Sequence, residues 1–302
     1  MIKKVIAASL VLIFVLTLAA CKGEELPSAE EIISRAMAAL EDVETYQFDA
    51  EIDLEITFEA EGESGEVTAD MECSGAMDVT NAEMMTNMDI DVTGTGEFGE
   101  DMTMSVGMEM YLIDSTMYGK IDMPFPLGGP SSEWIKLEMP EDLMEQQIPM
   151  NQMDYLTEIL ELVELKVTGT QKINGLVCYV LEFTPNPDEL WELIMQQLQM
   201  SEQMEDMMAS ELEQIRGIVN EIANNISVKF WIAKDNYYLT RIEYDIALDI
   251  IPEDLGMPEE EGRVAADMNM IFDVHEINQP ISIELPPEAE DAVEMPSSDF
   301  PW

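Results

Sequence analysis

The chain has 302 residues, of which 64 are Asp or Glu and 13 are Lys or Arg, which gives a formal net charge of −51 at pH 7. This charge argues against a nucleic-acid partner, because binding to phosphates requires clustered Lys and Arg. It also repels anionic lipid head groups, although salt screens that repulsion beyond about 8 Å. Adaptation to salt or a need for solubility would explain the same acidity.

The first 20 residues have the pattern of a secretory signal peptide. Two lysines precede an apolar run at 5–18 that is too short to span a bilayer comfortably, and small residues follow. The run ends in Leu18-Ala19-Ala20-Cys21, which resembles the lipobox of bacterial lipoproteins. That resemblance implies a lipidated Cys21 as the mature N-terminus, with residues 21–27 as a tether and acyl chains such as palmitate anchoring an extracytoplasmic protein to the bacterial cell membrane. An ordinary secretory signal or an N-terminal membrane helix is the alternative, and whether the inner or the outer membrane is meant stays open.

A short helix and then long strands follow the tether. Ser28 and Glu31 have the spacing of a capping box and predict a helix that ends near Asp42. Apolar and polar residues then alternate with a period of two, which predicts strands with one buried and one wet face. The alternating segments are 46–58, 67–79, 84–92, 102–112, 238–250 and 264–274. Short turns between the first four predict a meander.

The rest of the chain adds a hairpin, helices and a tail. Asn174-Gly175 separates apolar segments at 165–173 and 176–183 and predicts a β-hairpin. A helix is predicted at 153–162, and amphipathic helices are predicted at 188–200 and 202–224. Residues 28–286 then form one domain, since no linker divides them, and the acidic, Pro-rich tail at 287–302 is expected to be poorly ordered.

Three phrases of the sequence occur in a familiar order. They are the helix at 32–40 that leads into strand 46–58, the hairpin at 230–242, and the closing phrase 277–286 with its Asn278-Gln279-Pro280. This order resembles the superfamily of LolA/LppX/LprG-like bacterial lipoproteins. The resemblance implies an α+β fold, in which a strongly curved antiparallel sheet, an incomplete β-barrel, carries helices over its concave face. It also implies an apolar cavity for a lipid or an acylated ligand, and it supplies no catalytic residue.

A ligand is expected between the helices 188–200 and 202–224 and the sheet. Met is common here, at 26 residues, and its flexible thioether suits a cavity that must fit variable chains. The side chains predicted to line the cavity are Phe48, Leu54, Met104, Met108, Ile194, Met195, Met207, Tyr244 and Met268.

Metal sites and cofactors are not predicted. Thioethers suit Cu(I), but the Met residues fall at strand and helix periods without an accompanying His or Cys cluster. Residues 89–100 approximate an EF-hand calcium loop, but the flanking segments are strands, and a hairpin turn explains the same residues. Cys73 and Cys178 form either one disulfide or two buried thiols.

Enzymatic activity is not expected either. His275 is the only histidine, and the chain has no GxSxG elbow, Walker loop or HExxH motif. Two hypotheses then stand: a lipoprotein that binds or carries a lipid, and a sensory or structural interaction lipoprotein with a filled cavity, comparable to RseB-like proteins. The expected partners are a lipid or acylated ligand, the membrane and, in the second case, a protein.

Overall fold

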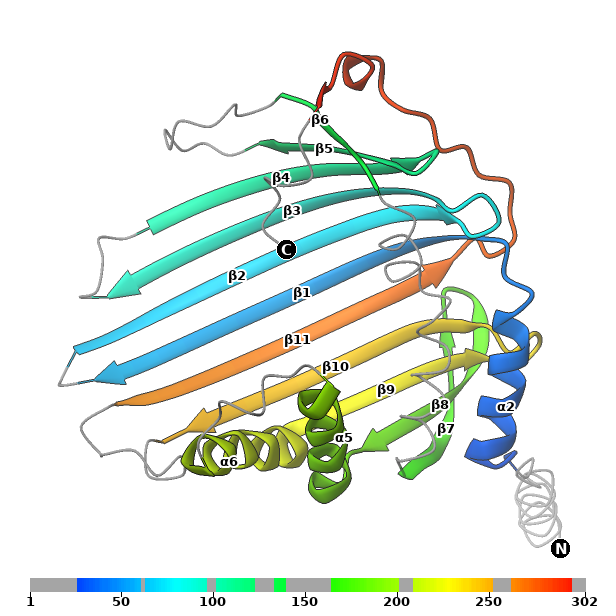
Figure 1. Ribbon diagram of the computed structural model, residues 1–302. Coiled ribbons are helices and arrows are strands. Elements are labelled where there is room, and N and C mark those ends of the chain that lie inside the picture. Colours follow the sequence, from blue (N-terminus) through cyan, green and yellow to red (C-terminus); the bar gives the residue numbers. More distant parts are fainter. Residues whose placement is uncertain are drawn as a thin grey trace, which may run out of the picture.

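Alternating strands build one twelve-stranded sheet in the computed structural model (Figure 1), which describes residues 26–60, 63–96, 102–122, 133–139, 164–200, 209–251 and 262–294. The strand order is β12-β6-β5-β4-β3-β2-β1-β11-β10-β9-β8-β7. All neighbours are antiparallel except β12 and β6, which are parallel. The sheet is open and strongly curved, so the predicted α+β incomplete barrel is confirmed.

The elements have the following bounds. The strands are β1 (Thr45–Ala60), β2 (Glu63–Asp78), β3 (Glu83–Gly96), β4 (Met102–Ile113), β5 (Thr116–Asp122), β6 (Ile135–Glu138), β7 (Glu164–Ile173), β8 (Leu176–Thr184), β9 (Ile226–Ala233), β10 (Leu239–Ile250), β11 (Arg263–His275) and β12 (Val293–Glu294). The helices are α2 (Ala29–Leu40), α5 (Pro187–Met200), α6 (Ala209–Asn225) and the 3-10 helix η5 (Pro287–Ala289).

The register keeps apolar and polar side chains on opposite faces. Leu54 of β1 pairs with Ala69 of β2 and Met268 of β11. One position earlier, Asp53 pairs with an Asp of β2 and an Asn of β11. Because side chains alternate across a strand, the rows that contain Leu54 are uncharged over several strands, and the charged residues lie in the rows of the other face.

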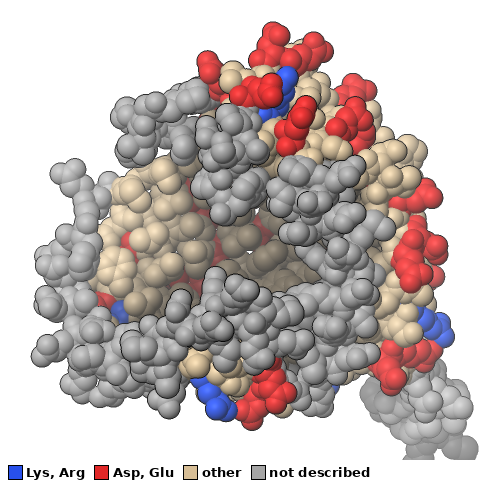
Figure 2. Space-filling model, in the orientation of Figure 1, with Lys and Arg blue, Asp and Glu red and all other residues tan. Residues whose placement is uncertain are grey.

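Helix α2 shows which face is concave. Its buried Ile32 and Ala36 pack against Tyr179, Leu181 and Ile232, which pair in register with the apolar rows. Helices α2, α5 and α6 lie in front of the sheet in Figure 1. Figure 2, in the same orientation, shows a hollow that exposes mostly uncharged residues. The apolar face is therefore the concave face.

The start of α2 is capped as the sequence predicts, but only on one side. The Glu31 amide donates to Ser28 Oγ at 3.1 Å, which confirms Ser28 as the N-cap. The Glu31 carboxylate does not complete the capping box, because it accepts from Arg35 Nη2 at 2.6 Å. Helix α2 thus begins with one cap bond and one exposed ion pair.

Two phenylalanines of β1 lie over glycines of β2. Phe48 pairs with Gly75, and Phe58 pairs with Gly65. A Cβ atom built on Gly75 would lie 2.5 Å from the Phe48 ring, and one on Gly65 would lie 2.2 Å from the Phe58 ring. The missing side chains let both rings approach the backbone of the neighbouring strand closely.

The start of β10 faces the other way from the prediction, because the strand contains a bulge. The sequence places Tyr238 and Thr240 on the same face as Ile242 and Tyr244, but the register shifts between Leu239 and Arg241. Thr240 is buried and donates to the Trp231 carbonyl at 2.9 Å. The extra residue of a bulge reverses the alternation before it, which period counting alone does not detect.

The β7–β8 hairpin forms at the predicted turn. Asn174 and Gly175 both have positive φ, 47° and 90°, as the tight turns that match the twist of a hairpin require. Residues 188–200 are confirmed as helical in α5, and the helix predicted at 202–224 is described from Ala209.

Residues 287–294 are more ordered than the sequence predicts. Poor order was expected from residue 287, but residues 287–294 form η5 and β12. Ala289 is fully buried, and with Ala292 it packs against Tyr111 and Trp134. Small apolar residues hold this segment, whereas composition alone indicated a solvated tail.

Several predictions fall outside the described residues, namely the signal peptide, Cys21, most of the tether, the helix at 153–162 and Met207. The calcium-loop alternative, which the sequence did not favour, does not fit the described residues 89–96, because they belong to the regular strand β3. Among the residues that the structure describes, no helix combines the length and the apolar character needed to cross a membrane.

Candidate functional site

The candidate site is the concave face of the sheet, which we call the apolar wall. It consists of the even-numbered residues of 46–58, 84–94, 102–112, 242–248 and 264–274 and the odd-numbered residues of 67–77. No Asp, Glu, Lys, Arg or His stands at any of these positions. Most of these side chains are half-buried rather than buried, and at the strand ends Met102 and Val264 are each 43% exposed.

Four predicted lining residues lie on three adjacent strands of the wall. Leu54 of β1 is directly opposite Met268 of β11. Phe48 of β1 stacks on Phe272 of β11, with ring centroids 5.5 Å apart. Tyr244 of β10 pairs with Met270 of β11. The structure therefore brings Phe48, Leu54, Tyr244 and Met268 into one continuous apolar surface.

The other predicted lining residues lie apart from this group. Met104 and Met108 are on β4, on the same face but three strands beyond β1. Ile194 and Met195 are half-buried on α5. The eight predicted residues that the structure describes thus mark out the wall and one covering helix rather than one compact pocket.

The helices cover one end of the wall. Helix α6 packs on β10, with Val219 and Ala223 each 3% exposed, and α5 packs on α6. Arg216 of α6 forms an ion pair of 3.2 Å with Asp188 and lies 5.8 Å from the Trp191 ring of α5. The described helices lie over the β9–β10 end (Figure 1), so the expectation that helices cover the concave face holds for that end of the described sheet.

Polar atoms on the wall are uncharged. The Tyr46 hydroxyl donates to the Met77 sulfur at 3.1 Å. Burial raises the pKa of the Tyr46 and Tyr244 phenols, and burial followed by the charge of Asp49 raises the pKa of the Cys73 thiol. Each of these groups is therefore neutral near pH 7.

The two described cysteines are free thiols on opposite faces. Cys73 lies on the wall, opposite Ala50 and Met88. Cys178 is fully buried on β8, and its sulfur lies 3.4 Å from Thr240 Oγ1. Of the two alternatives that the sequence left open, separate thiols are correct and the disulfide is not.

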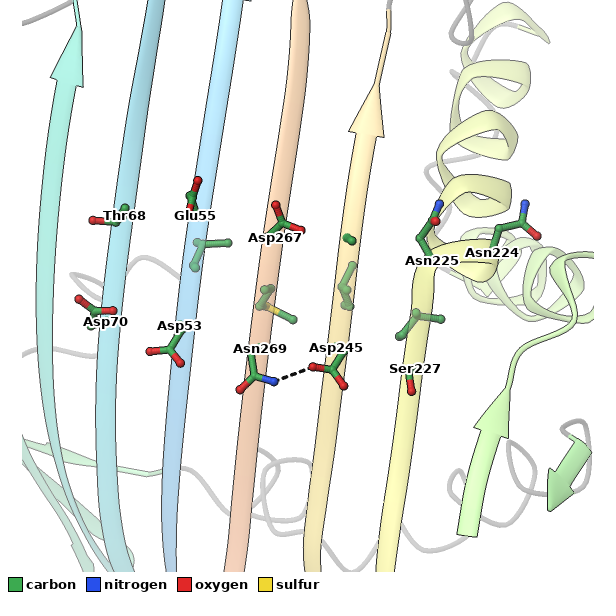
Figure 3. A pocket seen from close by; sticks show the side chains of 15 residues that line it. Asp53, Glu55, Thr68, Asp70, Asn224, Asn225, Ser227, Asp245, Asp267 and Asn269 are labelled. Carbon is green, nitrogen blue, oxygen red and sulfur yellow. Dashed lines mark hydrogen bonds between the residues drawn. The ribbon is translucent and has the colours of Figure 1, made fainter. Parts of the chain in front are cut away.

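A pocket of about 660 Å³ is lined mainly by the polar outer face (Figure 3). Its labelled side chains form a band across β2, β1, β11 and β10, with Asn224 and Asn225 at the end of α6. Asn269 donates to Asp245 at 2.7 Å, while Asp53 and Asp70 are exposed. Of the predicted residues only Leu54 and Met268 contribute to it. We interpret this groove as the solvated side of the sheet, because its carboxylates are exposed and ordinary strand alternation places them there.

No group of three or more His, Cys, Asp and Glu within the described segments is arranged to hold a metal ion. Bases of β9 and β10 instead pair with carboxylates on the outer face. Arg241 forms two hydrogen bonds with Asp273, of 2.7 and 2.5 Å. Lys229 pairs with Glu243 at 2.8 Å. Since both partners of each pair are partly exposed, the pairs relieve local repulsion rather than mark a catalytic centre.

Together these features define an open, strongly curved α+β half-barrel with an uncharged concave face. The chain belongs to a family of unknown function, DUF6612, whose model matches residues 28–294. No curated protein sequence matches it at a significant level.

Solved structures that resemble the chain are distant. Lipoprotein LppX of Mycobacterium tuberculosis is 12% identical, with a TM-score of 0.36, and the match covers 84% of this chain and 97% of LppX. LprF of Mycobacterium bovis is 14% identical, with a TM-score of 0.39, over 85% and 96% of the two chains. MucB of Pseudomonas aeruginosa, in its complex with MucA, is 9% identical, with a TM-score of 0.28, over 80% and 56%. LppX and LprF are of the class that the sequence resembles, and the likeness concerns the fold alone.

Proposed function

We propose that this protein is an extracytoplasmic lipoprotein that binds or carries a lipid or acylated molecule on its apolar wall, and that it is not an enzyme. The observation that supports the proposal is the wall itself, an uncharged face that the described helices cover only at one end. Soluble proteins rarely leave large contiguous apolar surfaces without a partner, and such surfaces mark ligand or membrane sites. Acyl chains match the wall because each methylene removed from water contributes about 0.8 kcal/mol.

Flexible side chains on the wall suit this role. Met88 pairs with Met108, and Met71 pairs with Ile52 and Ile90. Thioether side chains adapt to irregular shapes at low cost. A wall of this kind would accept chains of differing length or branching without a rigid complementary pocket.

The ligand is tested first on native protein. The full chain, purified from its membrane fraction without added lipid, is extracted with organic solvent, and the extract is analysed by mass spectrometry. We expect a stoichiometric lipid or acylated molecule. Protein that is free of lipid and also takes up no added fluorescent acyl lipid would remove the carrier function and leave an interaction protein with a filled cavity.

Charged substitutions on the wall should abolish lipid uptake. Met108→Asp and Tyr244→Asp each place a carboxylate on the apolar surface, and its desolvation opposes an acyl chain. We expect fluorescent acyl-lipid uptake to fall at least about tenfold, which corresponds to about 1.4 kcal/mol. Met108→Leu and Tyr244→Phe are the matched controls and should bind like the natural chain. Unchanged uptake in Asp variants that circular dichroism shows to be folded would contradict the proposed site.

The membrane anchor depends on Cys21. Lipidation requires its thiol, so we expect Cys21→Ser to lose acylation and move from the membrane fraction to the soluble fraction. Metabolic labelling with palmitate and fractionation measure this change. Continued processing and membrane association of the Ser variant would show that the anchor is a different one.

A further inference from the structure

Four bases, on β5, β9, β10 and β11, lie on the outer face, away from the apolar wall. Each is ion-paired there, and the pairs are Lys120 with Glu109 and Asp122, Lys229 with Glu243, Arg241 with Asp273, and Arg263 with Asp249. On the two helices beside the wall, Arg35 is paired with Glu31 and Arg216 with Asp188. These cations are therefore engaged by carboxylates of the same molecule.

An anionic head group would meet no counter-charge on the wall. Every wall position is Gly, Ala, Val, Leu, Ile, Met, Phe, Tyr, Thr or Cys. A phosphate that contacts such a surface loses water and gains no cation in exchange. This desolvation is costly for an unpaired ion. The net charge of −51 adds repulsion outside the wall.

The wall does offer neutral hydrogen-bonding groups. They are the hydroxyls of Tyr46, Tyr244 and Thr86, of which Tyr46 is bonded to Met77 and Thr86 is 6% exposed. A phenolic hydroxyl donates to or accepts from esters, hydroxyls and amides without requiring charge on the ligand. Such groups can orient an uncharged polar part of a lipid.

Building on the proposed function, we infer that the apolar wall selects lipids whose polar part carries no negative charge, such as diacylglycerols or neutral glycolipids, over anionic lipids with the same chains. Two effects of different range produce this selection. The uncharged wall acts at contact, whereas the net charge acts over roughly one Debye length, about 8 Å at physiological salt. Only the second effect should weaken when salt is added.

The test compares two lipids that differ only in the phosphate. Full-length protein is titrated with dipalmitoylglycerol and with dipalmitoyl phosphatidate, both carrying the same fluorophore on one chain and presented in the same nonionic detergent. At physiological salt we expect the diacylglycerol to bind at least about tenfold more tightly. In 1 M NaCl the preference should shrink but persist.

Each outcome bears on one of the two proposals. Equal or tighter binding of the phosphatidate overturns the selectivity and leaves lipid binding intact. Binding of neither lipid overturns the proposed function itself. A preference that disappears completely in 1 M NaCl overturns the role of the uncharged wall and assigns the selectivity to net charge alone.

A cation placed on the wall should relax the preference. Met102 is 43% exposed at the end of β4, so Met102→Lys can keep its ammonium near solvent without disrupting the sheet. We expect the preference for diacylglycerol to fall at least about threefold, with Met102→Leu unchanged. Val264→Lys, at an equally exposed wall position on β11, is the second variant if the first does not fold. A folded Lys variant with an unchanged preference would contradict the inference.

Discussion

Asn278 joins three parts of the chain that are distant in sequence. Its Oδ1 accepts from the amides of Glu44 and Thr45 at 2.7 and 3.4 Å. Its Nδ2 donates to the Asp42 carbonyl at 2.9 Å and to the Tyr238 hydroxyl at 3.2 Å. Its φ is 56°, a left-handed conformation that Asn tolerates better than most residues. The Asn-Gln-Pro phrase therefore fixes the turn between α2 and β1.

Replacing Asn278 should destabilise the fold. Asn278→Ala removes four hydrogen bonds and puts Ala, which tolerates positive φ less well than Asn, at this position. We therefore expect the free energy of unfolding, measured with urea, to fall by about 1–3 kcal/mol. Asn278→Gly removes the same hydrogen bonds but adopts positive φ without strain. Its stability should therefore lie between those of the natural chain and Asn278→Ala. Stability within about 0.5 kcal/mol of the natural chain for Asn278→Ala would contradict this role.

At the scale of elements, the pairing of β1 with β2 depends on glycines of β2 that lie opposite phenylalanines of β1. Gly75 lies under the Phe48 ring, and a Cβ there would also lie 2.5 Å from the Met85 carbonyl oxygen of β3. Both neighbours would have to move. The same arrangement recurs at Gly65 and Phe58, ten residues farther along β1. The wall is thus shaped by where glycines interrupt the apolar rows.

Gly75→Ala should therefore be costly. Overpacking of this kind costs about 1–3 kcal/mol, which urea unfolding would measure. In a Phe48→Leu background the ring clash disappears but the Met85 carbonyl stays, so we expect the cost to shrink without vanishing. The double-mutant cycle gives the coupling directly. A cost that is identical in both backgrounds would show that the ring is not the obstacle.

At the scale of the whole molecule, like-charge repulsion opposes folding. The chain has 64 acidic residues and 13 basic residues, and cross-strand rows such as Asp53–Asp70 and Glu51–Glu72 bring carboxylates together on the outer face. Like charges directly opposite each other destabilise a sheet. The fold therefore relies on its apolar contacts to offset this repulsion.

Salt should stabilise the protein. Screening reduces the repulsion between exposed carboxylates, so we expect the free energy of unfolding to rise by more than about 1 kcal/mol between roughly 0.02 and 0.5 M NaCl. Urea titrations at both salt concentrations measure the change, and an equal osmolality of sucrose controls for solute exclusion. A decrease in stability with NaCl would indicate that the ion pairs outweigh the repulsion.

The sequence by itself determined the long strands and most of their faces. Unbroken period-two alternation fixed the long strands, and the Asn174-Gly175 and Ser28 signals fixed a turn and a helix start, because each depends on neighbours within a few residues. Its resemblance to a lipoprotein superfamily also pointed to the half-barrel.

Only the tertiary structure decided how those elements combine. The bulge at Thr240, the burial of Ala289, the separation of Cys73 from Cys178 and the position of α6 on β10 all depend on contacts between distant segments. The register decided that Leu54 and Tyr244 share a surface while Met104 lies several strands away. Local pattern records which side of a strand a residue faces, but strand order and curvature set which of those residues meet.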